Sequence, residues 1–326
     1  MSRFAVSRTL EGVLARARRR LLVSVLPGAL VCGCSTVGDV LARAEGDSTS
    51  DGSDADTTAG DAPRLDAAAP DLGPADDACG SMGAWWCPTT IASWGVQRYV
   101  PIDDAVVAEV LSVPLFQIDA TDVATWASQG RTVVCSFSAG ISTWNDPDRA
   151  MVLDATGPEI VPGQPERWMD TTSPVVREAM RARLDQAVAS GCVAVEPFDL
   201  HGWLEQTGLA LTQQTATDYA AFLADAAHAR GLGFALSGVP ALADALAASS
   251  DLAIDYACLV DDACGAYDGF REGGKLVLHA EVVAAETVGN IEMIAATVCA
   301  ESAAWSMTTI FKKPDLGVWH HACNGA

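Results

Sequence analysis

Short apolar runs alternate with longer amphipathic stretches from about residue 94 to the end of the chain. This rhythm is typical of parallel β-strands connected by helices, because each strand is buried on both faces and each helix buries one apolar face against the sheet. An eight-stranded barrel has room for eight strands, and the pattern offers one more, so one of the assignments is either wrong or lies outside the barrel. The predicted strands are 94–97, 115–119, 132–138, 168–170, 192–197, 233–237, 252–256, 276–281 and 308–311.

Two of the intervening helices have clear start or stop signals. Ser173-Pro174 provides an N-cap followed by a first-turn proline, and apolar residues recur at helical spacing after it. Another helix is predicted to begin at Thr212 and to stop at Gly231. Strands and helices together predict a single α/β domain over residues 79–326, a (β/α)8 TIM-like barrel of about 250 residues, which is a usual size for that fold.

Residues 1–34 have a different pattern, with several arginines ahead of a short apolar run over 21–31. A membrane-spanning helix needs roughly 20 apolar residues, so this segment is predicted to be an export signal. The stretch Val31-Cys32-Gly33-Cys34 resembles a bacterial lipoprotein cleavage box, which predicts lipidation at Cys34. The expected location is the cell surface or the exterior, with a lipid as the membrane anchor. Secretion without a lipid is the alternative.

Residues 35–78 are dominated by Asp, Ala, Ser, Thr, Gly and Pro over most of their length. Such a segment buries too little apolar surface to offset the entropy of ordering it, and its like charges repel one another. We therefore predict a disordered acidic linker that holds the barrel away from a surface.

Cysteine usage is consistent with export. Eight of the ten cysteines follow Cys34, and an even number in an exported chain favours disulfides. The short spacing of Cys258 and Cys264 predicts a bridge between them, while the other pairings stay open. The spacing of Cys and His does not match a zinc motif, so no metal and no cofactor are expected.

The charge balance narrows the choice of partner. The formal net charge is −22, and residues 79–326 alone contain 12 Lys and Arg against 30 Asp and Glu, a charge of −18. Nucleic acid is therefore excluded as a partner, whereas a cationic ligand would be attracted. An adaptation for solubility or salt is the alternative, and the charge taken alone favours it. The domain is expected to be a monomer.

Four of the predicted strands end in a carboxylate: Asp119, Asp170, Glu196 and Glu281. In a barrel the C-terminal ends of all strands meet at one opening, where binding and catalysis occur. A single acid at this position is usually the cap of the next helix, but four of them predict a shared, carboxylate-lined cleft.

The order of several motifs resembles glycoside hydrolase family 114, whose known activity is endo-α-1,4-polygalactosaminidase. The resemblance covers nearly all of residues 84–323 and does not depend on any single motif. The similar segments are Trp85-Trp86-Cys87-Pro88, Ser93-Trp94-Gly95-Val96-Gln97, Gln117-Ile118-Asp119, Val134-Cys135-Ser136-Phe137-Ser138-Ala139-Gly140, Pro165-Glu166-Arg167-Trp168-Met169-Asp170, Gly191-Cys192-Val193-Ala194-Val195-Glu196-Pro197, Asp251-Leu252-Ala253-Ile254 and Lys275-Leu276-Val277-Leu278-His279-Ala280-Glu281.

The resemblance implies endo-hydrolysis of an α-1,4-linked galactosamine polysaccharide by acid/base carboxylates. The expected catalytic residues are Glu196, Asp170 and Asp199. The residues expected to bind the substrate are Asp119, Glu281, Trp94, Gln97, Ser136, Ser138, His201, Trp203 and Tyr256.

Two departures from the family pattern affect the chemistry. Phe198 stands where the family has aspartate after glutamate-proline, and Tyr256 stands where it has glutamate. Glycoside hydrolysis ordinarily needs two carboxyl groups, and these two positions are where the family's pair would be placed. The sequence therefore leaves two hypotheses open. One is a hydrolase with relocated acids, and the other is an inactive lipoprotein that captures cationic amino-sugar polymers without cleaving them.

Overall fold

The computed structural model describes residues 85–99, 102–103 and 107–323. The predicted export signal, the acidic linker and the lipidation site at Cys34 lie outside the described residues. Within these ranges, no helix combines the length and the apolar character needed to cross a bilayer.

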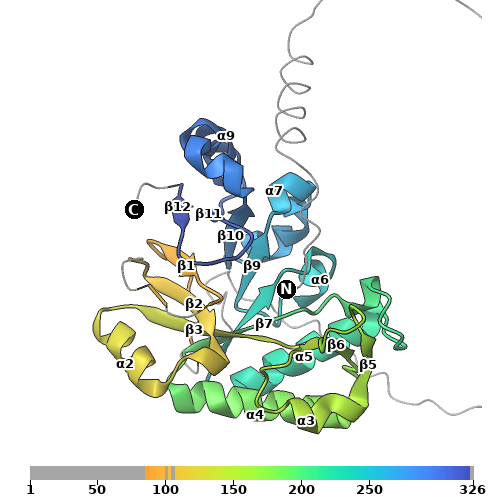
Figure 1. Ribbon diagram of the computed structural model, residues 1–326. Helices are drawn as coiled ribbons and strands as arrows, with labels where there is room; N and C mark the ends of the chain where they lie inside the picture. Colours follow the sequence, from red (N-terminus) through yellow and green to blue (C-terminus); the bar gives the residue numbers. More distant parts are fainter. Residues whose placement is uncertain (1–84, 100–101, 104–106, 324–326) are drawn as a thin grey trace, which may run out of the picture. The chain divides into compact units, whose positions relative to one another are not determined.

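Eight parallel strands form a nearly closed barrel, and a final strand pairs antiparallel with the eighth (Figure 1). The gap between the first and eighth strands is bridged where the Trp94 indole Nε1 donates to the Thr308 carbonyl at 2.9 Å. In sheet order the strands are β1 (Trp94–Val96), β2 (Val110–Pro114), β3 (Thr132–Ser138), β7 (Ala194–Phe198), β8 (Gly233–Ser237), β9 (Leu252–Tyr256), β10 (Leu276–Val282), β11 (Thr308–Lys312) and β12 (His320–Ala322).

Helices cover the outside of the barrel, with α2, α4 and α5 along one side in Figure 1. The α-helices are α2 (Ala120–Ser128), α3 (Arg149–Val152), α4 (Pro174–Ser190), α5 (Gln213–His228), α6 (Pro240–Leu246), α7 (Cys258–Asp261), α8 (Asp268–Glu272) and α9 (Ile291–Ala304). Short 3-10 helices are η1 (Leu115–Gln117), η2 (Leu153–Ala155), η3 (Gly202–Leu204), η4 (Cys264–Tyr267) and η5 (Ala285–Asn290).

The two helices predicted from their end signals are present. The side chain of Ser173 caps α4 by accepting from the Val175 amide, and α4 ends at Gly191 in the left-handed conformation. Thr212 caps α5, which ends at His228, three residues before the predicted stop.

Side chains on the barrel strands alternate between the barrel interior and the layer beneath the helices. On β7, for example, Ala194 belongs to the interior cluster and Val195 to the cluster shared with the helices. Because the period of a strand is two, Glu196 and Phe198 share the interior face with Ala194. This alternation decides which strand-end acids can reach the opening.

Two of the predicted strands need correction. Residues 168–170 overlap β6 (Arg167–Met169), which pairs with β4 (Ile141–Ser142) and β5 (Thr156–Glu159) in a separate antiparallel sheet. Residues 115–119 are not a strand. The barrel strand lies earlier, at β2, and the predicted segment contains the η1 turn and ends at Asp119, the N-cap of α2.

Three disulfides link described residues. Cys258–Cys264 is the bridge that the sequence predicts, and it closes the turn after β9. Cys135–Cys192 joins β3 to the segment before β7, and Cys299–Cys323 joins α9 to the end of the described chain.

Candidate active site

Glu196 lies at the centre of the barrel opening, enclosed by donors from neighbouring strands. Its side chain is fully buried. One carboxylate oxygen accepts from Ser237 Oγ at 2.7 Å and from Tyr256 Oη at 2.8 Å. The other accepts a hydrogen bond from Ser112 Oγ. The carboxylate is thus held in one orientation by hydroxyl groups from β2, β8 and β9.

Arg98, two residues after β1, places a positive charge beside this carboxylate. Its Nη2 lies 2.6 Å from Glu196 Oε1 and 2.7 Å from Tyr256 Oη. Its Nη1 donates to Ser136 Oγ at 2.6 Å and to Ser112 Oγ at 3.1 Å. These bonds use the four Nη hydrogens. We call Arg98, Ser112, Ser136, Glu196, Ser237 and Tyr256 the Arg98–Glu196 cluster.

The two positions that depart from the family pattern form the walls around Arg98. The guanidinium carbon lies 5.1 Å from the centroid of the Phe198 ring and 5.9 Å from that of Tyr256. Contacts of this kind are favourable for a partly desolvated cation. Burial raises the pKa of Tyr256 well above its ordinary value, so its phenol stays protonated and donates to Glu196.

The charge of Arg98 is secure despite its burial. Burial by itself would lower the pKa of the guanidinium, but the charge of Glu196, its hydrogen bond and the charges of Tyr256 and Asp199 together outweigh this effect and raise the pKa. The side chain is 12% exposed, whereas that of Glu196 is not exposed at all, so the positive member of the pair is the one nearer to solvent.

Hydrogen bonds that involve main-chain groups hold the loop after β1 in place beside the barrel opening. Gln97, fully buried, donates from Nε2 to the Asp103 carbonyl at 3.2 Å and accepts from the Asp103 amide at 2.9 Å. The Arg98 amide donates to the Leu316 carbonyl at 3.0 Å. Lys312, at the end of β11, is a second buried basic residue beside Arg98. Burial lowers the pKa of its amine to about 8.

Asp199 is the other acid at the opening. It follows β7 with φ of 62°, a left-handed conformation that Asp tolerates better than most residues. Its Oδ2 accepts from Ser138 Oγ at 2.7 Å. Burial raises the pKa of the carboxyl, and the Ser138 hydrogen bond opposes that effect without cancelling it.

Beside Asp199 the surface is aromatic. The rings of His201 and Trp168 make an edge contact at 5.1 Å between centroids. Trp168 and Trp203 also line a cavity of about 10 Å³, which has room for roughly one water molecule. Trp168 is buried, so the half-buried His201 and Trp203 are the rings in this group that could pack against a sugar.

The prediction that four strand-end acids share one cleft is wrong for Asp119 and Asp170. Asp119 is exposed and caps α2, accepting from the Thr121 and Asp122 amides at 2.7 and 3.0 Å. These backbone donors lower the pKa of its carboxyl. Asp170 follows β6 in the separate sheet, and it accepts from the Thr172 amide and hydroxyl. Both acids serve local turns.

Glu281 also lies away from the opening. It shares with His279 the outward face of β10, whereas Leu278 and Ala280 face the interior. Burial raises the pKa of Glu281. Trp94 faces the interior near the start of β1, where its indole joins the barrel wall and does not line the opening.

The structure therefore brings most of the predicted site residues together, but it pairs Glu196 with Arg98 and serine hydroxyls and not with a second acid. Arg98, Ser112, Ser237 and Lys312 were not predicted. The signal that could have drawn attention to Arg98 is the scarcity of basic residues, because a cation just after the first barrel strand is unusual in so acidic a domain. From the expected set, the opening contains Glu196, Asp199, Gln97, Ser136, Ser138, His201, Trp203 and Tyr256.

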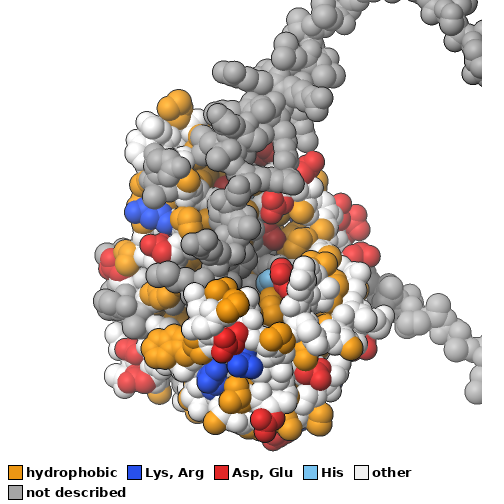
Figure 2. All heavy atoms as spheres, turned by 45° about the vertical axis from the view of Figure 1, so that its right-hand side comes forward, with side chains coloured by type: hydrophobic (Ala, Val, Ile, Leu, Met, Phe, Trp, Pro, Cys, Tyr) orange, Lys and Arg blue, Asp and Glu red, His pale blue; other side chains and the backbone are white. Residues whose placement is uncertain are grey.

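Acidic side chains outnumber basic ones in the barrel domain. In the view of Figure 2, Asp and Glu side chains are spread over the face, whereas Lys and Arg appear only in small groups.

Comparisons with known proteins agree with this architecture. The model of glycoside-hydrolase family GH114 matches residues 75–326. The solved structure of Aspergillus fumigatus Ega3 in complex with galactosamine is 28% identical, with a TM-score of 0.65, and the match covers 73% of this chain and 97% of that one. The glycoside hydrolase domain of PelA from Pseudomonas aeruginosa shares the fold, with 12% identity, a TM-score of 0.56 and coverage of 72% and 99%. No curated protein matches the chain.

Proposed function

Because the chain belongs to glycoside-hydrolase family GH114, we propose that it is a carbohydrate-binding member of that family, which holds an amino-sugar polymer at the barrel opening without hydrolysing it. The observation that supports this proposal most directly is the ion pair of Arg98 with Glu196 at 2.6 Å.

Hydrolysis of a glycosidic bond ordinarily requires one carboxyl group to protonate the leaving oxygen and another to attack the sugar or to activate water. Glu196 has its oxygens occupied by Arg98, Tyr256 and two serine hydroxyls, so neither a proton nor a sugar carbon can reach it without dismantling the cluster. Phe198, on the same face of β7, offers no acid at all.

The proposed ligand class follows from charge and from similarity. Ega3 was solved with galactosamine, and it is 28% identical to this chain over 97% of its own length. A polymer that contains free amino sugars carries ammonium groups, which the net charge of −18 over residues 79–326 would attract. Trp144, which is 69% exposed after β4, adds an aromatic face available for stacking.

Hydrolysis is retained as a second candidate because of Asp199. Its enclosed carboxyl has a raised pKa, as a general acid requires, and it directly follows the strand that holds Glu196. In this alternative Asp199 would protonate the leaving group, and Glu196 would need to leave Arg98 to act as its partner.

The test compares cleavage with binding on one polymer. The purified full chain is incubated with a partially deacetylated α-1,4-linked galactosamine polymer, and released oligosaccharides are measured by mass spectrometry. Binding is measured in parallel by calorimetry. We expect micromolar binding that weakens between low and physiological salt, with no released product. Released product that Asp199→Asn abolishes would instead establish the hydrolase.

We also propose that the protein is exported and held at the cell surface by a lipid on Cys34. The support is the arginine-rich, apolar leader and the cleavage-box resemblance around Cys34. Labelling cells with a fatty-acid analogue should modify the wild-type protein and not Cys34→Ala. Equal labelling of both proteins would contradict the anchor.

A further inference from the structure

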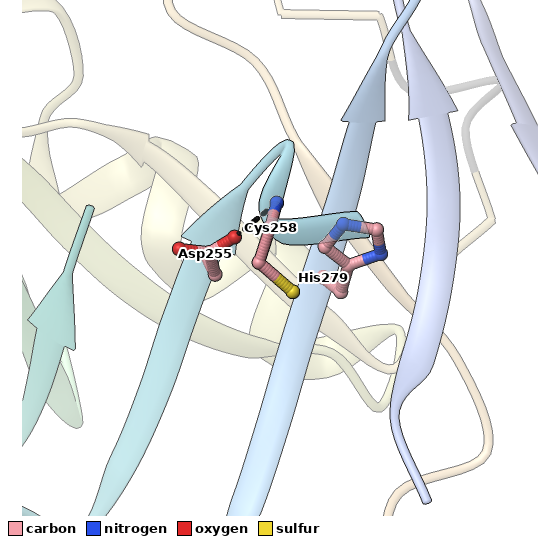
Figure 3. A group of neighbouring side chains, drawn as sticks. All are labelled: Asp255, Cys258 and His279. Atoms are coloured by element: carbon pink, nitrogen blue, oxygen red, sulfur yellow. Dashed lines mark hydrogen bonds between the residues drawn. The ribbon is translucent and has the colours of Figure 1, made fainter. Parts of the chain in front are cut away.

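A group of buried polar side chains on the outward face of the barrel wall serves the local structure. Figure 3 shows Asp255 and His279 on the neighbouring strands β9 and β10, with Cys258 between them. The sulfur of Cys258 is bound to Cys264 in a disulfide. Asp255 accepts from the Cys258 amide at 2.7 Å and from Tyr267 Oη at 2.6 Å. These contacts stabilise the turn after β9.

An exposed tryptophan beside the barrel opening is a better indication of a further binding place. Trp144 belongs to the short loop that follows β4, residues 143–148, which we call the Trp144 loop. Trp144 is 69% exposed, whereas the other eight tryptophans, all within the described ranges, are buried or half-buried. A single exposed aromatic side chain is common on protein surfaces. The position and the rigidity of its loop distinguish Trp144.

The Trp144 loop lies on the side of the barrel where the strands end, close to Asp199. Gly140, just before β4, packs directly on the main chain of Asp199, since a Cβ atom at Gly140 would overlap the Asp199 carbonyl oxygen. Trp144 follows Gly140 by four residues, so their Cα atoms are at most about 14 Å apart. Burial is the main reason that the pKa of Asp199 is raised, and the charge of Asp146 in the loop adds to the effect.

β4 also connects the Trp144 loop to the rings beside Asp199. Ile141 is the register partner of Trp168, and the ring of Trp168 makes an edge contact with His201. Trp144 follows Ile141 by three residues, which limits the distance between their Cα atoms to about 11 Å. Asp199 and the rings next to it are therefore only a short distance from the Trp144 loop.

Hydrogen bonds and ion pairs hold the Trp144 loop in one conformation. The Thr143 amide donates to Asp146 Oδ2 at 2.9 Å, and the Thr143 hydroxyl donates to Asp146 Oδ1 at 2.7 Å. Arg183 of α4, which is fully buried, donates to Asp148 from Nε at 2.8 Å and from Nη2 at 2.7 Å. Its Nη2 also lies 3.2 Å from Asp146 Oδ2.

Arg183 links this loop to the barrel opening as well. Its Nη1 donates to the Ser138 carbonyl at 2.6 Å, and the Ser138 hydroxyl donates to Asp199. A ligand that binds to a loop already ordered in this way immobilises few additional groups, so less of the contact energy is lost as entropy. The Trp144 loop thus presents an aromatic face that is ready for a ligand.

We propose that the Trp144 loop is an outer sugar subsite, at which the indole of Trp144 stacks on one ring of the polymer while another ring occupies the barrel opening. Indole faces suit both sugar rings and ammonium groups. The subsite rests on the proposed glycan-binding function and adds to it a preference for chain length. A disaccharide contacts one of the two places, whereas a longer oligosaccharide contacts both within a single binding event.

Calorimetry with a disaccharide and a hexasaccharide of α-1,4-linked galactosamine tests the subsite on the full chain. The hexasaccharide should bind the wild type more tightly than the disaccharide. Trp144→Leu, which keeps an apolar side chain without the flat ring, should lose about 5- to 10-fold in affinity for the hexasaccharide and keep its affinity for the disaccharide. Met293→Ala is the control, because Met293 is 74% exposed on α9, and neither affinity should change.

Fluorescence reports on the same contact, because Trp144 is the tryptophan most accessible to a quencher. The hexasaccharide should protect the wild type from acrylamide quenching and should protect Trp144→Leu much less. Thr143 is tested as a positioning residue. Thr143→Val, which removes the hydroxyl that holds the turn, should lose about 3-fold in hexasaccharide affinity, and Thr143→Ser should restore it with the Tm unchanged throughout.

The outcomes separate the subsite from the proposed function. If Trp144→Leu binds the hexasaccharide as tightly as the wild type, or if Met293→Ala loses as much affinity as Trp144→Leu, the subsite is overturned while glycan binding at the opening stands. If the wild type binds neither oligosaccharide, the proposed function is wrong and the subsite falls with it.

Discussion

Replacement of Arg98 by methionine tests the view that the barrel opening is built around an ion pair. The change removes the guanidinium and keeps a side chain of useful length for packing between the Phe198 and Tyr256 rings. Glu196 then remains fully buried without its counter-charge. The hydroxyl donors Ser112 and Ser237 stay in place.

The expected loss follows from the geometry of the pair. Unit charges about 4 Å apart attract by about 4 kcal/mol at an effective dielectric constant near 20. Breaking a buried pair typically costs about 3–5 kcal/mol. Because the hydroxyl donors still stabilise the carboxylate of Glu196, we place the loss near the lower limit, at about 3 kcal/mol. For a domain of this size that corresponds to a fall in Tm of about 6–12 °C.

The assay is urea unfolding at neutral pH for the wild type, Arg98→Met, Glu196→Met and the double variant. Replacing both charges should cost less than replacing either alone, because no unpaired charge remains. The coupling energy from this cycle should be about 3 kcal/mol. Methylguanidinium at low millimolar concentration should partly restore Arg98→Ala, whose short side chain leaves the guanidinium site open, whereas uncharged methylurea should not.

Two results would refute this reasoning. One is a loss of less than about 1 kcal/mol for Arg98→Met, which would mean that solvent screens the pair as it does at a surface. The other is a double variant whose loss equals the sum of the two single losses, since additivity means that the residues do not interact.

Two further predictions concern other parts of the barrel. Asp199→Asn should stabilise the protein at neutral pH, because the raised pKa of Asp199 means that its ionised form destabilises the folded state. The gain should vanish as the pH falls through that pKa toward 4, where the wild-type carboxyl becomes protonated. A difference in Tm between the two proteins that does not change with pH would contradict this reasoning. Replacing both cysteines of a bridge by alanine should cost about 4 kcal/mol for Cys135–Cys192, with a sequence separation of 57, and about 2 kcal/mol for Cys258–Cys264, with a separation of 6. Urea unfolding of the two paired variants checks the order, and equal losses would contradict the loop-entropy argument.

The barrel could be predicted from the sequence because its strands and helices leave local signals. Runs such as 132–138 and 252–256 coincide with β3 and β9, and the cap at Ser173 marks the start of α4. The error at 115–119 has a local cause. The apolar residues of β2 continue directly into η1, and Asp119 follows η1. The pattern therefore predicts the strand five residues after its actual start.

The site was harder to predict because a parallel strand is buried on both faces. Glu196 and Glu281 both lie near the ends of apolar runs, and no polar alternation shows which side each one faces. The register places Glu196 with the interior residue Ala194 and Glu281 on the face opposite Ala280. Only long-range pairing, which the sequence does not state, separates these two acids.

Arg98, Phe198 and Tyr256 depend on one another, and this dependence limits how the opening could regain acid chemistry. The two rings provide faces for the guanidinium, and the Tyr256 hydroxyl both accepts from Arg98 and donates to Glu196. If Phe198→Asp and Tyr256→Glu were introduced alone, two more carboxylates would surround the same cation and would hold Arg98 more tightly. The double variant should therefore still release no oligosaccharide, and activity should require a third change that removes Arg98. If the double variant cleaved the polymer while Arg98 was intact, the guanidinium would not be what keeps the opening inactive.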